Sequence, residues 1–220
     1  MKISKETLAI LKNFQSINKS LLFTEGKELR TISEAGTLFA IAQIEEEIPA
    51  RAGIYELGKL ISALGMYDEP DVTFGDRFFE IKNSTGKQKM RLVYTDPSLI
   101  YAPPEGKTLK MPDIDVKFEL SQEDFSNIMK AGSSLGLTDF MVKGDGEMLY
   151  VGVANATDRN ADSFFIEIGE YDKEIQYVVD ITSLKFLNSN YIIKIGSKRV
   201  VFDNGKVQYF VALDSKKSKL

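Results

Sequence analysis

The sequence contains no cysteine and no histidine among its 220 residues. Without cysteine there is no disulfide framework, no thiolate metal site and no cysteine nucleophile, and without histidine there is no imidazole base and no histidine-ligated zinc. These absences exclude most hydrolase mechanisms. Catalysis could still use a carboxylate pair, a lysine Schiff base or carboxylate-bound Mg²⁺, because such sites need only Asp, Glu and Lys. No spacing of acidic residues in the sequence demands such a pair.

Long hydrophobic runs are also missing. The longest ones, 38–42 and 209–213, have five residues each, whereas a membrane helix needs roughly twenty. The first residues lead directly into a charged amphipathic segment and lack the apolar region of a secretory signal. We therefore expect no membrane association and a cytoplasmic location.

The composition is that of a folded protein, with 43% hydrophobic and 27% charged residues. A chain of 220 residues can form one large domain or two of about 110 residues. With 28 basic and 32 acidic residues, the net charge of −4 argues against a protein that coats nucleic acid generally. A local basic surface remains compatible with this balance.

Segments with the pattern of β-strands dominate the sequence. They are rich in β-branched and aromatic residues and are separated by turns such as Asp203-Asn204-Gly205. Because few segments show helical spacing, we predict an α+β protein built on antiparallel sheets. The predicted helices are 5–17, 56–64, 122–133 and 181–187, and the predicted strands are 28–32, 37–44, 72–74, 77–82, 89–95, 116–120, 140–143, 148–154, 163–170, 175–180, 191–195, 199–202 and 207–213.

A proline-rich segment, 97–112, lies near the middle of the chain and holds four of its six prolines. Proline lacks an amide hydrogen and favours extended geometry in the preceding residue, so this segment is interpreted as a connector between domains. The predicted organisation is a first domain over 1–96, the connector 97–112, a second domain over 113–213 and a basic tail over 214–220. We expect the tail to be frayed.

The two halves resemble each other. Ser4 and Ser121 are both candidate helix N-caps, and each is flanked by apolar residues at the spacing of a hydrophobic staple. Two further matches follow in the same order, 37–42 with 148–153 and 56–60 with 180–184. The order of the matches indicates a duplicated βα unit.

The predicted helices carry lysines opposite their apolar faces. On a helical wheel Lys5, Lys12 and Lys19 fall within about 60° of one another, and Lys59 and Lys130 also lie opposite apolar stripes. For any single helix, a solvated surface explains such lysines well. If several helices gathered their lysines on one surface of an acidic protein, that surface would attract phosphates without contacting base edges.

Three short motifs are incomplete. Residues 106–108 resemble the end of a phosphate-binding loop, but Tyr101 occupies the position of its first glycine. Residues 158–162 match the first ligands of a calcium loop and lack its later glycine and glutamate, so they are interpreted as a polar turn. The acidic run 45–47 shows no acid–base partner and is interpreted as a solvated strand end or loop.

Several segments, taken in order, resemble the sliding clamps of T4-like bacteriophages. The similarity extends over essentially the whole chain and is least clear in the middle of the first half. These segments are patterns of fold rather than a catalytic signature, so the resemblance rests on their order and on the matching length. They are 1–7 with 11–14, 54–57, 181–185 with 190–191, and 209–213.

The resemblance implies a DNA polymerase processivity factor and not an enzyme. In this family three two-domain subunits form a ring around double-stranded DNA, with helices lining the hole and antiparallel sheets forming the outer shell. It implies a homotrimer, because six similar domains close the ring, and the replicative DNA polymerase and an ATP-driven clamp loader as partners. It also implies that no cofactor is needed and that the location is the cytoplasm of an infected bacterium. The lysines expected to face DNA are Lys5, Lys12, Lys19, Lys59, Lys130 and Lys185, although the last lies in a helix too short to phase.

The resemblance also implies an apolar pocket beside the connector and the C-terminal strand, where short peptides of polymerase and other partners bind. Leu38 and Ala40 could equally be core residues. Subunits of the family pair edge strands, for which 89–95 and 163–170 are the candidates here. By position the pocket residues are Ile32, Leu38, Ala40, Tyr101, Pro103 and Phe210.

Two other hypotheses stay open at this stage. A carboxylate-based enzyme, such as a glycosidase or a metal-dependent phosphodiesterase, would show a buried, convergent pair of acidic side chains in a cleft. A virion or scaffold protein of repeated β-rich domains would not gather the lysines of its helices on one concave surface.

Overall fold

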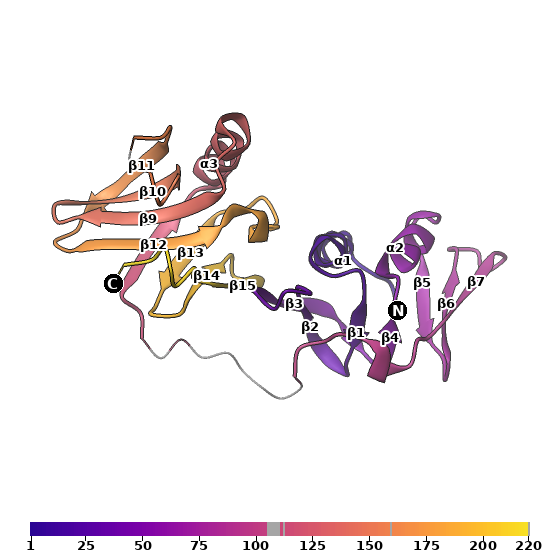
Figure 1. Ribbon diagram of the computed structural model, residues 1–220. Coiled ribbons are helices and arrows are strands. Elements are labelled where there is room, and N and C mark those ends of the chain that lie inside the picture. Colours follow the sequence, from indigo (N-terminus) through magenta and orange to yellow (C-terminus); the bar gives the residue numbers. More distant parts are fainter. Residues whose placement is uncertain (105–110, 112, 159, 220) are drawn as a thin grey trace. The chain divides into compact units, whose positions relative to one another are not determined.

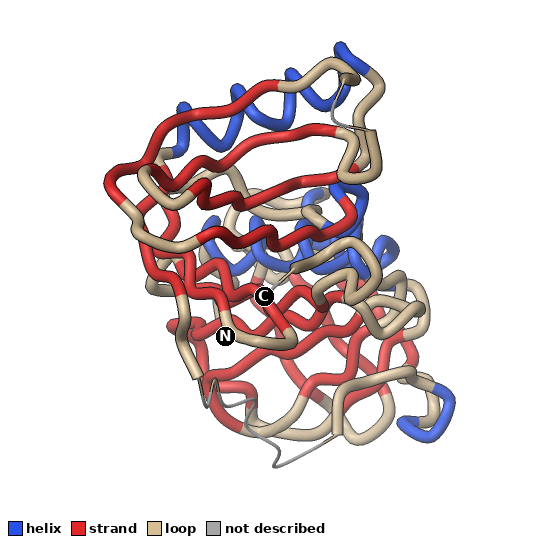
Figure 2. The backbone as a smooth tube through the Cα atoms, turned by 60° about the vertical axis from the view of Figure 1, so that its left-hand side comes forward, coloured by secondary structure: helices blue, strands red, loops and turns tan. Residues whose placement is uncertain are grey.

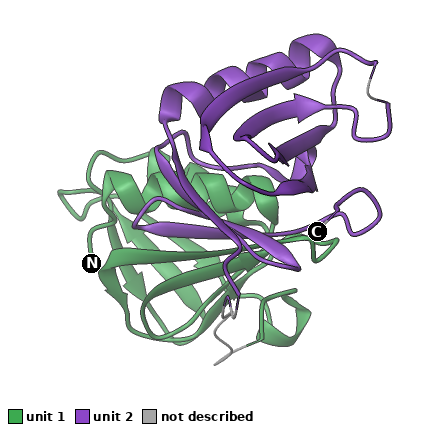
Figure 3. Cartoon of the chain, turned by 90° about the vertical axis from the view of Figure 1, so that its left-hand side faces the viewer, with its two compact units in different colours: residues 1–107 green, residues 108–220 purple. Residues whose placement is uncertain are grey.

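The computed structural model describes residues 1–104, 111, 113–158 and 160–219 (Figure 1). The chain divides into two compact units, residues 1–107 and 108–220 (Figure 3). Strand residues outnumber helical residues in each unit, and Figure 2 shows strands in red with few helices in blue, as the α+β prediction requires. The finer bounds, with a connector over 97–112, remain a prediction. Much of this connector, including the incomplete phosphate-loop motif at 106–108, lies outside the described residues.

Unit 1 contains two helices that pack against each other, and α1 also packs on the antiparallel pair β2 and β3. The short strands β1 and β4 pair with each other, and β5, β6 and β7 form an antiparallel sheet in that order. The elements of unit 1 are α1 (Lys5–Ile17), β1 (Leu21–Phe23), β2 (Gly26–Ile32), β3 (Leu38–Ile48), β4 (Ala52–Ile54), α2 (Leu57–Gly65), β5 (Asp71–Phe74), β6 (Phe78–Lys82), β7 (Lys89–Val93) and the 3₁₀ helix η1 (Pro97–Leu99).

Unit 2 packs its helix α3 on strands β10 and β11. The sheet beneath α3 has the order β11-β10-β9-β12, and the strands β15, β14, β13 and β8 lie side by side in that order. The elements of unit 2 are β8 (Val116–Leu120), α3 (Gln122–Leu135), β9 (Asp139–Asp145), β10 (Met148–Ala154), β11 (Phe164–Glu170), β12 (Glu174–Asp180), the 3₁₀ helix η2 (Ile181–Ser183), β13 (Tyr191–Ile195), β14 (Arg199–Asp203) and β15 (Val207–Ala212).

The helices α1 and α3 begin in the same way, which confirms the match between the two halves at this point. The backbone of Ser4 (φ −67°, ψ 156°) is almost identical to that of Ser121 (φ −69°, ψ 156°). Each serine hydroxyl accepts a hydrogen bond from the backbone N–H three residues later, of Thr7 at 3.1 Å and of Asp124 at 3.0 Å. These bonds satisfy a donor that the first helical turn leaves without a partner.

The helix predicted over 181–187 is wrong. Only Ile181–Ser183 forms a turn of 3₁₀ helix, because buried aromatic side chains hold the following segment. The hydroxyl of Tyr209 accepts a hydrogen bond from the N–H of Leu187 at 3.2 Å, and the hydroxyl of Tyr191 donates to the carbonyl of the same residue. Both backbone groups of Leu187 are therefore used by side chains and not by a helix. Burial raises the pKa of both tyrosines.

The expectation of a frayed tail is also wrong. The N–H of Asp214 donates to the carbonyl of Val178 at 2.8 Å, and Lys219 pairs with Gln176 in β12. The segment from 214 to 219 is thus bound along the outer side of β12. Among the described residues, no helix is both long and apolar enough to span a membrane.

Candidate nucleic-acid and partner interfaces

Unit 1 presents four of the lysines singled out from the sequence. Lys5 and Lys12 are exposed on α1, Lys19 is exposed just beyond its end, and Lys59 is exposed on α2. The buried side of α1 is formed by apolar residues such as Phe14, which is 0% exposed. The helix therefore buries one face and presents its lysines on the other.

The structure brings Lys19 and Lys59 to one groove of about 560 Å³, which is also lined by Gln15, Ser62 and Met66. Lys59 forms an ion pair with Glu56, the residue just before the start of α2. Both side chains of this pair are mostly exposed, with 65% and 57% of their surface open, so the pair adds little stability.

Unit 2 presents the other two lysines. Lys130 is exposed on α3, on the side away from the buried Phe125 and Ile128. Lys185 is exposed in the segment after η2, which is not the helix expected there. All six lysines singled out from the sequence are exposed.

One carboxylate of the acidic run 45–47 bonds to the start of α1. Glu46 of β3 accepts hydrogen bonds from the N–H of Ser4 and, at 2.5 Å, from the hydroxyl of Thr7. Partial burial acts to raise the pKa of Glu46, but these hydrogen bonds outweigh it and hold the pKa below its ordinary value. The run 45–47 lies at the end of β3, as interpreted from the sequence, but Glu46 is only partly exposed and is bonded to the start of α1.

The predicted pocket residues of unit 1 lie at the end of β2, on β3 and after η1. Leu38 and Ala40 are buried, Ile32 is half-buried, and Pro103 is buried, whereas 53% of the surface of Tyr101 is exposed. Phe210, on β15 of unit 2, is buried.

A buried asparagine joins the end of β2 to the segment after η1. The side-chain amide of Asn18 donates to the carbonyls of Ile32 at 2.9 Å and Tyr101 at 3.1 Å. Beside it, Ala102 and Pro103 line a cavity of about 200 Å³ together with β1 and β2 side chains that include Glu28 and Arg30. The sequence did not single out Asn18, because nothing local marks an asparagine that bonds 83 residues away.

Both candidate interface strands lie at the edge of a sheet. In the described chain, β7 pairs with β6 alone and β11 pairs with β10 alone. Val93 at the end of β7 is 74% exposed, and Met90 and Leu92 line the groove under α2. Such an apolar edge is available for pairing with another chain. Across the described residues, no three acidic side chains cluster as ligands of a metal ion would.

No protein-family model matches the chain. The sliding clamp of Vibrio phage KVP40 is 28% identical over 222 residues, which cover 98% of this chain and 100% of that protein. The sliding clamp of Escherichia phage RB69 is 26% identical over 98% of this chain and 97% of its own length. Among solved structures, Proliferating Cellular Nuclear Antigen from Entamoeba histolytica superposes with a TM-score of 0.67 at 15% identity, over 94% of both chains. The structure of A. fulgidus PCNA with the C-terminal region of FEN-1 superposes equally well, with a TM-score of 0.67 at 14% identity over 94% of both chains.

The similarity to solved structures identifies the fold of the chain. The chain has the DNA sliding-clamp fold, as predicted, with two similar α+β units of antiparallel sheets. Its sequence relatives narrow the class further, because they are sliding clamps of T4-like phages matched over nearly the whole chain. By sequence it groups with those clamps, which confirms the resemblance found in the sequence.

Proposed function

We propose that the chain acts as a DNA polymerase processivity factor, in which copies close into a ring around duplex DNA and tether the polymerase to it. The observation that carries this proposal is the match to sliding clamps over 98% of the chain. A ring held on DNA by topology needs no tight binding. The polymerase gains effective concentration at the primer end, and the clamp itself catalyses nothing. The relatives do not favour a virion or scaffold role.

The ring is a homotrimer in this proposal. Each chain supplies two similar units, so three chains supply the six domains of a closed ring. The edge β7 of one copy pairs with the edge β11 of the next, and the exposed Val93 and the groove beside Met90 and Leu92 are covered in that contact. Such a head-to-tail contact generates a closed ring when the rotation between copies closes.

Lysines on the helices and in the segments that follow α1 and η2 line the hole and face the DNA. The chain has a net charge of −4, so a positive surface confined to the hole attracts phosphates while the acidic remainder repels them. Contacts with phosphates carry no sequence information, which lets the ring slide. The residues assigned to this surface are Lys5, Lys12, Lys19, Lys59, Lys130 and Lys185.

Partners bind at the pocket residues beside the connector, where Tyr101 is exposed and Pro103 is buried. The FEN-1 segment bound to A. fulgidus PCNA supports peptide binding by this fold. The partners proposed are the replicative polymerase and an ATP-driven clamp loader, in the cytoplasm of an infected bacterial cell.

Light scattering at several protein concentrations tests the assembly. Three copies of 24.7 kDa give about 74 kDa, and we expect this mass to be approached as concentration rises. Val93→Glu places a charge on the β7 edge and should shift the mass towards the monomer. Leu99→Glu is the matched control, because Leu99 is 66% exposed on η1 and belongs to neither edge strand. A chain that stays monomeric at every concentration would contradict the proposal.

A further inference from the structure

The sheet order β11-β10-β9-β12 has two outer strands, but only one of them is open. Along β12, the backbone groups of Gln176 and Val178 that point away from the sheet are used by the C-terminal segment. The N–H of Gln176 donates to the carbonyl of Lys219 at 2.9 Å, and the N–H of Lys219 donates back at 2.7 Å. The N–H of Val178 donates to the hydroxyl of Ser218 at 3.0 Å. The outer edge of β12 is thus occupied by the chain's own end.

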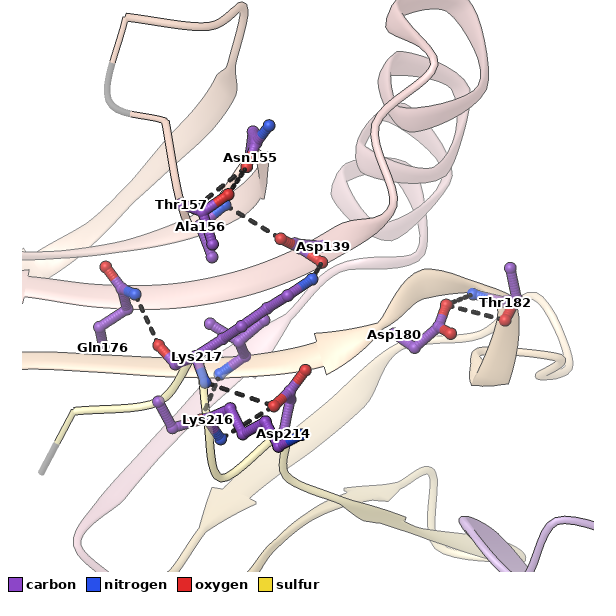
Figure 4. A network of polar contacts seen from close by, with 12 residues as sticks. Asp139, Asn155, Ala156, Thr157, Gln176, Asp180, Thr182, Asp214, Lys216 and Lys217 are labelled. Carbon is purple, nitrogen blue, oxygen red and sulfur yellow. Dashed lines mark hydrogen bonds and ion pairs between the residues drawn. The ribbon is translucent and has the colours of Figure 1, made fainter.

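A compact turn brings this segment back to the sheet. The side-chain carboxylate of Asp214 accepts hydrogen bonds from the N–H groups of Lys216 and Lys217, at 2.9 and 3.3 Å. The carbonyl of Lys217 then accepts a hydrogen bond from the side-chain amide of Gln176 at 2.8 Å. Figure 4 shows this turn beside β12, with Lys217 extending towards Asp139.

An ion pair with a buried carboxylate fastens the turn. The ammonium group of Lys217 lies 2.7 Å from one carboxylate oxygen of Asp139, and the N–H of Ala156 donates to the other at 3.0 Å (Figure 4). Asp139 is only 4% exposed. A buried carboxylate is costly without a partner, so the sheet is most stable with Lys217 in place.

Unit 1 also has segments that bond beside its three-stranded sheet. After β7, the N–H of Thr95 donates to the carbonyl of Gly53 in β4 at 2.8 Å. At the other outer strand, Lys2 forms a bridge with Asp71 of β5, and the N–H of Val72 donates to the carbonyl of Met1 at 2.8 Å. The β5 edge of unit 1, like the β12 edge of unit 2, is thus contacted by another segment of the chain, whereas in the described residues β7 and β11 each pair with one strand only.

We propose that residues 214–219 are an intrachain edge cover, latched by the Asp139–Lys217 ion pair, that prevents a second copy from pairing with β12. This inference rests on the proposed assembly through β7 and β11, because its purpose is to make β11 the only edge of that sheet available to the next copy. Uncovered edges with unpaired backbone groups are templates for wrong association.

The test removes the Asp139–Lys217 ion pair. It measures the hydrogen exchange of amides at the β12 edge and the mass of the assembly. In Lys217→Met the uncharged side chain keeps its apolar stem, and Asp139→Asn in the same chain avoids leaving a buried charge unpaired. We expect hydrogen exchange of the Gln176 and Val178 amides to rise about tenfold or more, while the amides between β9 and β10 are unchanged. Light scattering should then show species larger than the wild-type assembly. Lys216→Met removes the same charge from an exposed neighbour and should change neither result.

A second variant ends at Leu213 and removes the cover entirely. Faster exchange at Gln176 and Val178 without any gain in mass, in either variant, would overturn the proposal. Unchanged exchange in the shortened chain would overturn it as well. The mass of each variant is compared with that of the wild type. If the wild type is a monomer, the proposed ring is refuted, but the role of residues 214–219 is still decided by this comparison. Latch variants that associate beyond the wild type would still support the cover.

Discussion

Replacing Glu46 with alanine is expected to loosen the start of α1, the helix that carries Lys5 and Lys12. The change removes the acceptor of two hydrogen bonds, from the N–H of Ser4 and the hydroxyl of Thr7. A hydrogen bond to a charged group is worth about 1.5–3 kcal/mol, and a helix cap about 1 kcal/mol. The Ser4 hydroxyl still caps the helix in the variant, and water can reach Ser4, which is only partly buried. We therefore expect a loss of about 2 kcal/mol in the free energy of opening α1.

Native-state hydrogen exchange is the suitable assay, because it reports the opening of one segment within a chain of two units. A loss of about 2 kcal/mol corresponds to roughly 30-fold faster exchange of the α1 amides. Glu47→Ala is the matched control, since Glu47 is exposed on the same strand and carries the same charge. Equal exchange in the two variants would refute the capping role of Glu46.

The same contact predicts a dependence on pH. The pKa of Glu46 in the folded chain lies below the ordinary value of 4.5, through the hydrogen bonds that overcome its partial burial. Its contribution is therefore complete above pH 4.5 and is lost as the pH falls through the lower pKa of the folded state. After correction for intrinsic exchange, the protection of α1 should fall over this range in the wild type and fall less in Glu46→Ala.

Two further predictions concern the close approach of chain segments and the lysine surface. In Gly53→Ala the new methyl group would lie 2.6 Å from the carbonyl oxygen of Thr95. We therefore expect the free energy of unfolding, measured by calorimetry, to fall by about 1–3 kcal/mol. Gly65→Ala is the control and should not be destabilised, because its methyl group meets no atom within 4 Å. Replacing Lys12 and Lys130 together with glutamate should weaken processive synthesis without lowering the melting temperature, because both side chains are exposed. Unaltered synthesis would refute their proposed contact with DNA.

Features encoded by neighbouring residues could be predicted from the sequence. The bounds of α1 and the start of α3 follow from a serine cap followed by apolar residues at helical spacing, and the helical wheel placed Lys12 and Lys130 on exposed faces. The strands β8, β10 and β13 begin and end where their β-branched and aromatic residues predict. The strands β1 and β4 were missed, because three residues are too few to show a period.

Features that depend on distant residues could not be predicted. Glu46 caps a helix that lies 42 residues earlier in the chain, and no local pattern distinguishes it from its acidic neighbours. The segment after η2 is held by the tyrosine hydroxyls of β13 and β15, which override its helical spacing. The C-terminal lysines are typical of a solvated end, yet Lys217 reaches a buried carboxylate 78 residues away. In each case tertiary contacts decide the local structure.

Topological retention on DNA tests the central claim most directly. The chain is loaded onto a nicked circular duplex by the cognate loader with ATP, and the DNA-bound fraction is isolated by gel filtration before and after a single cut of the duplex. A closed ring predicts that the chain stays with the circle and leaves through the ends once the duplex is linear. Equal retention on circular and linear DNA, or no retention on the circle, would contradict encirclement.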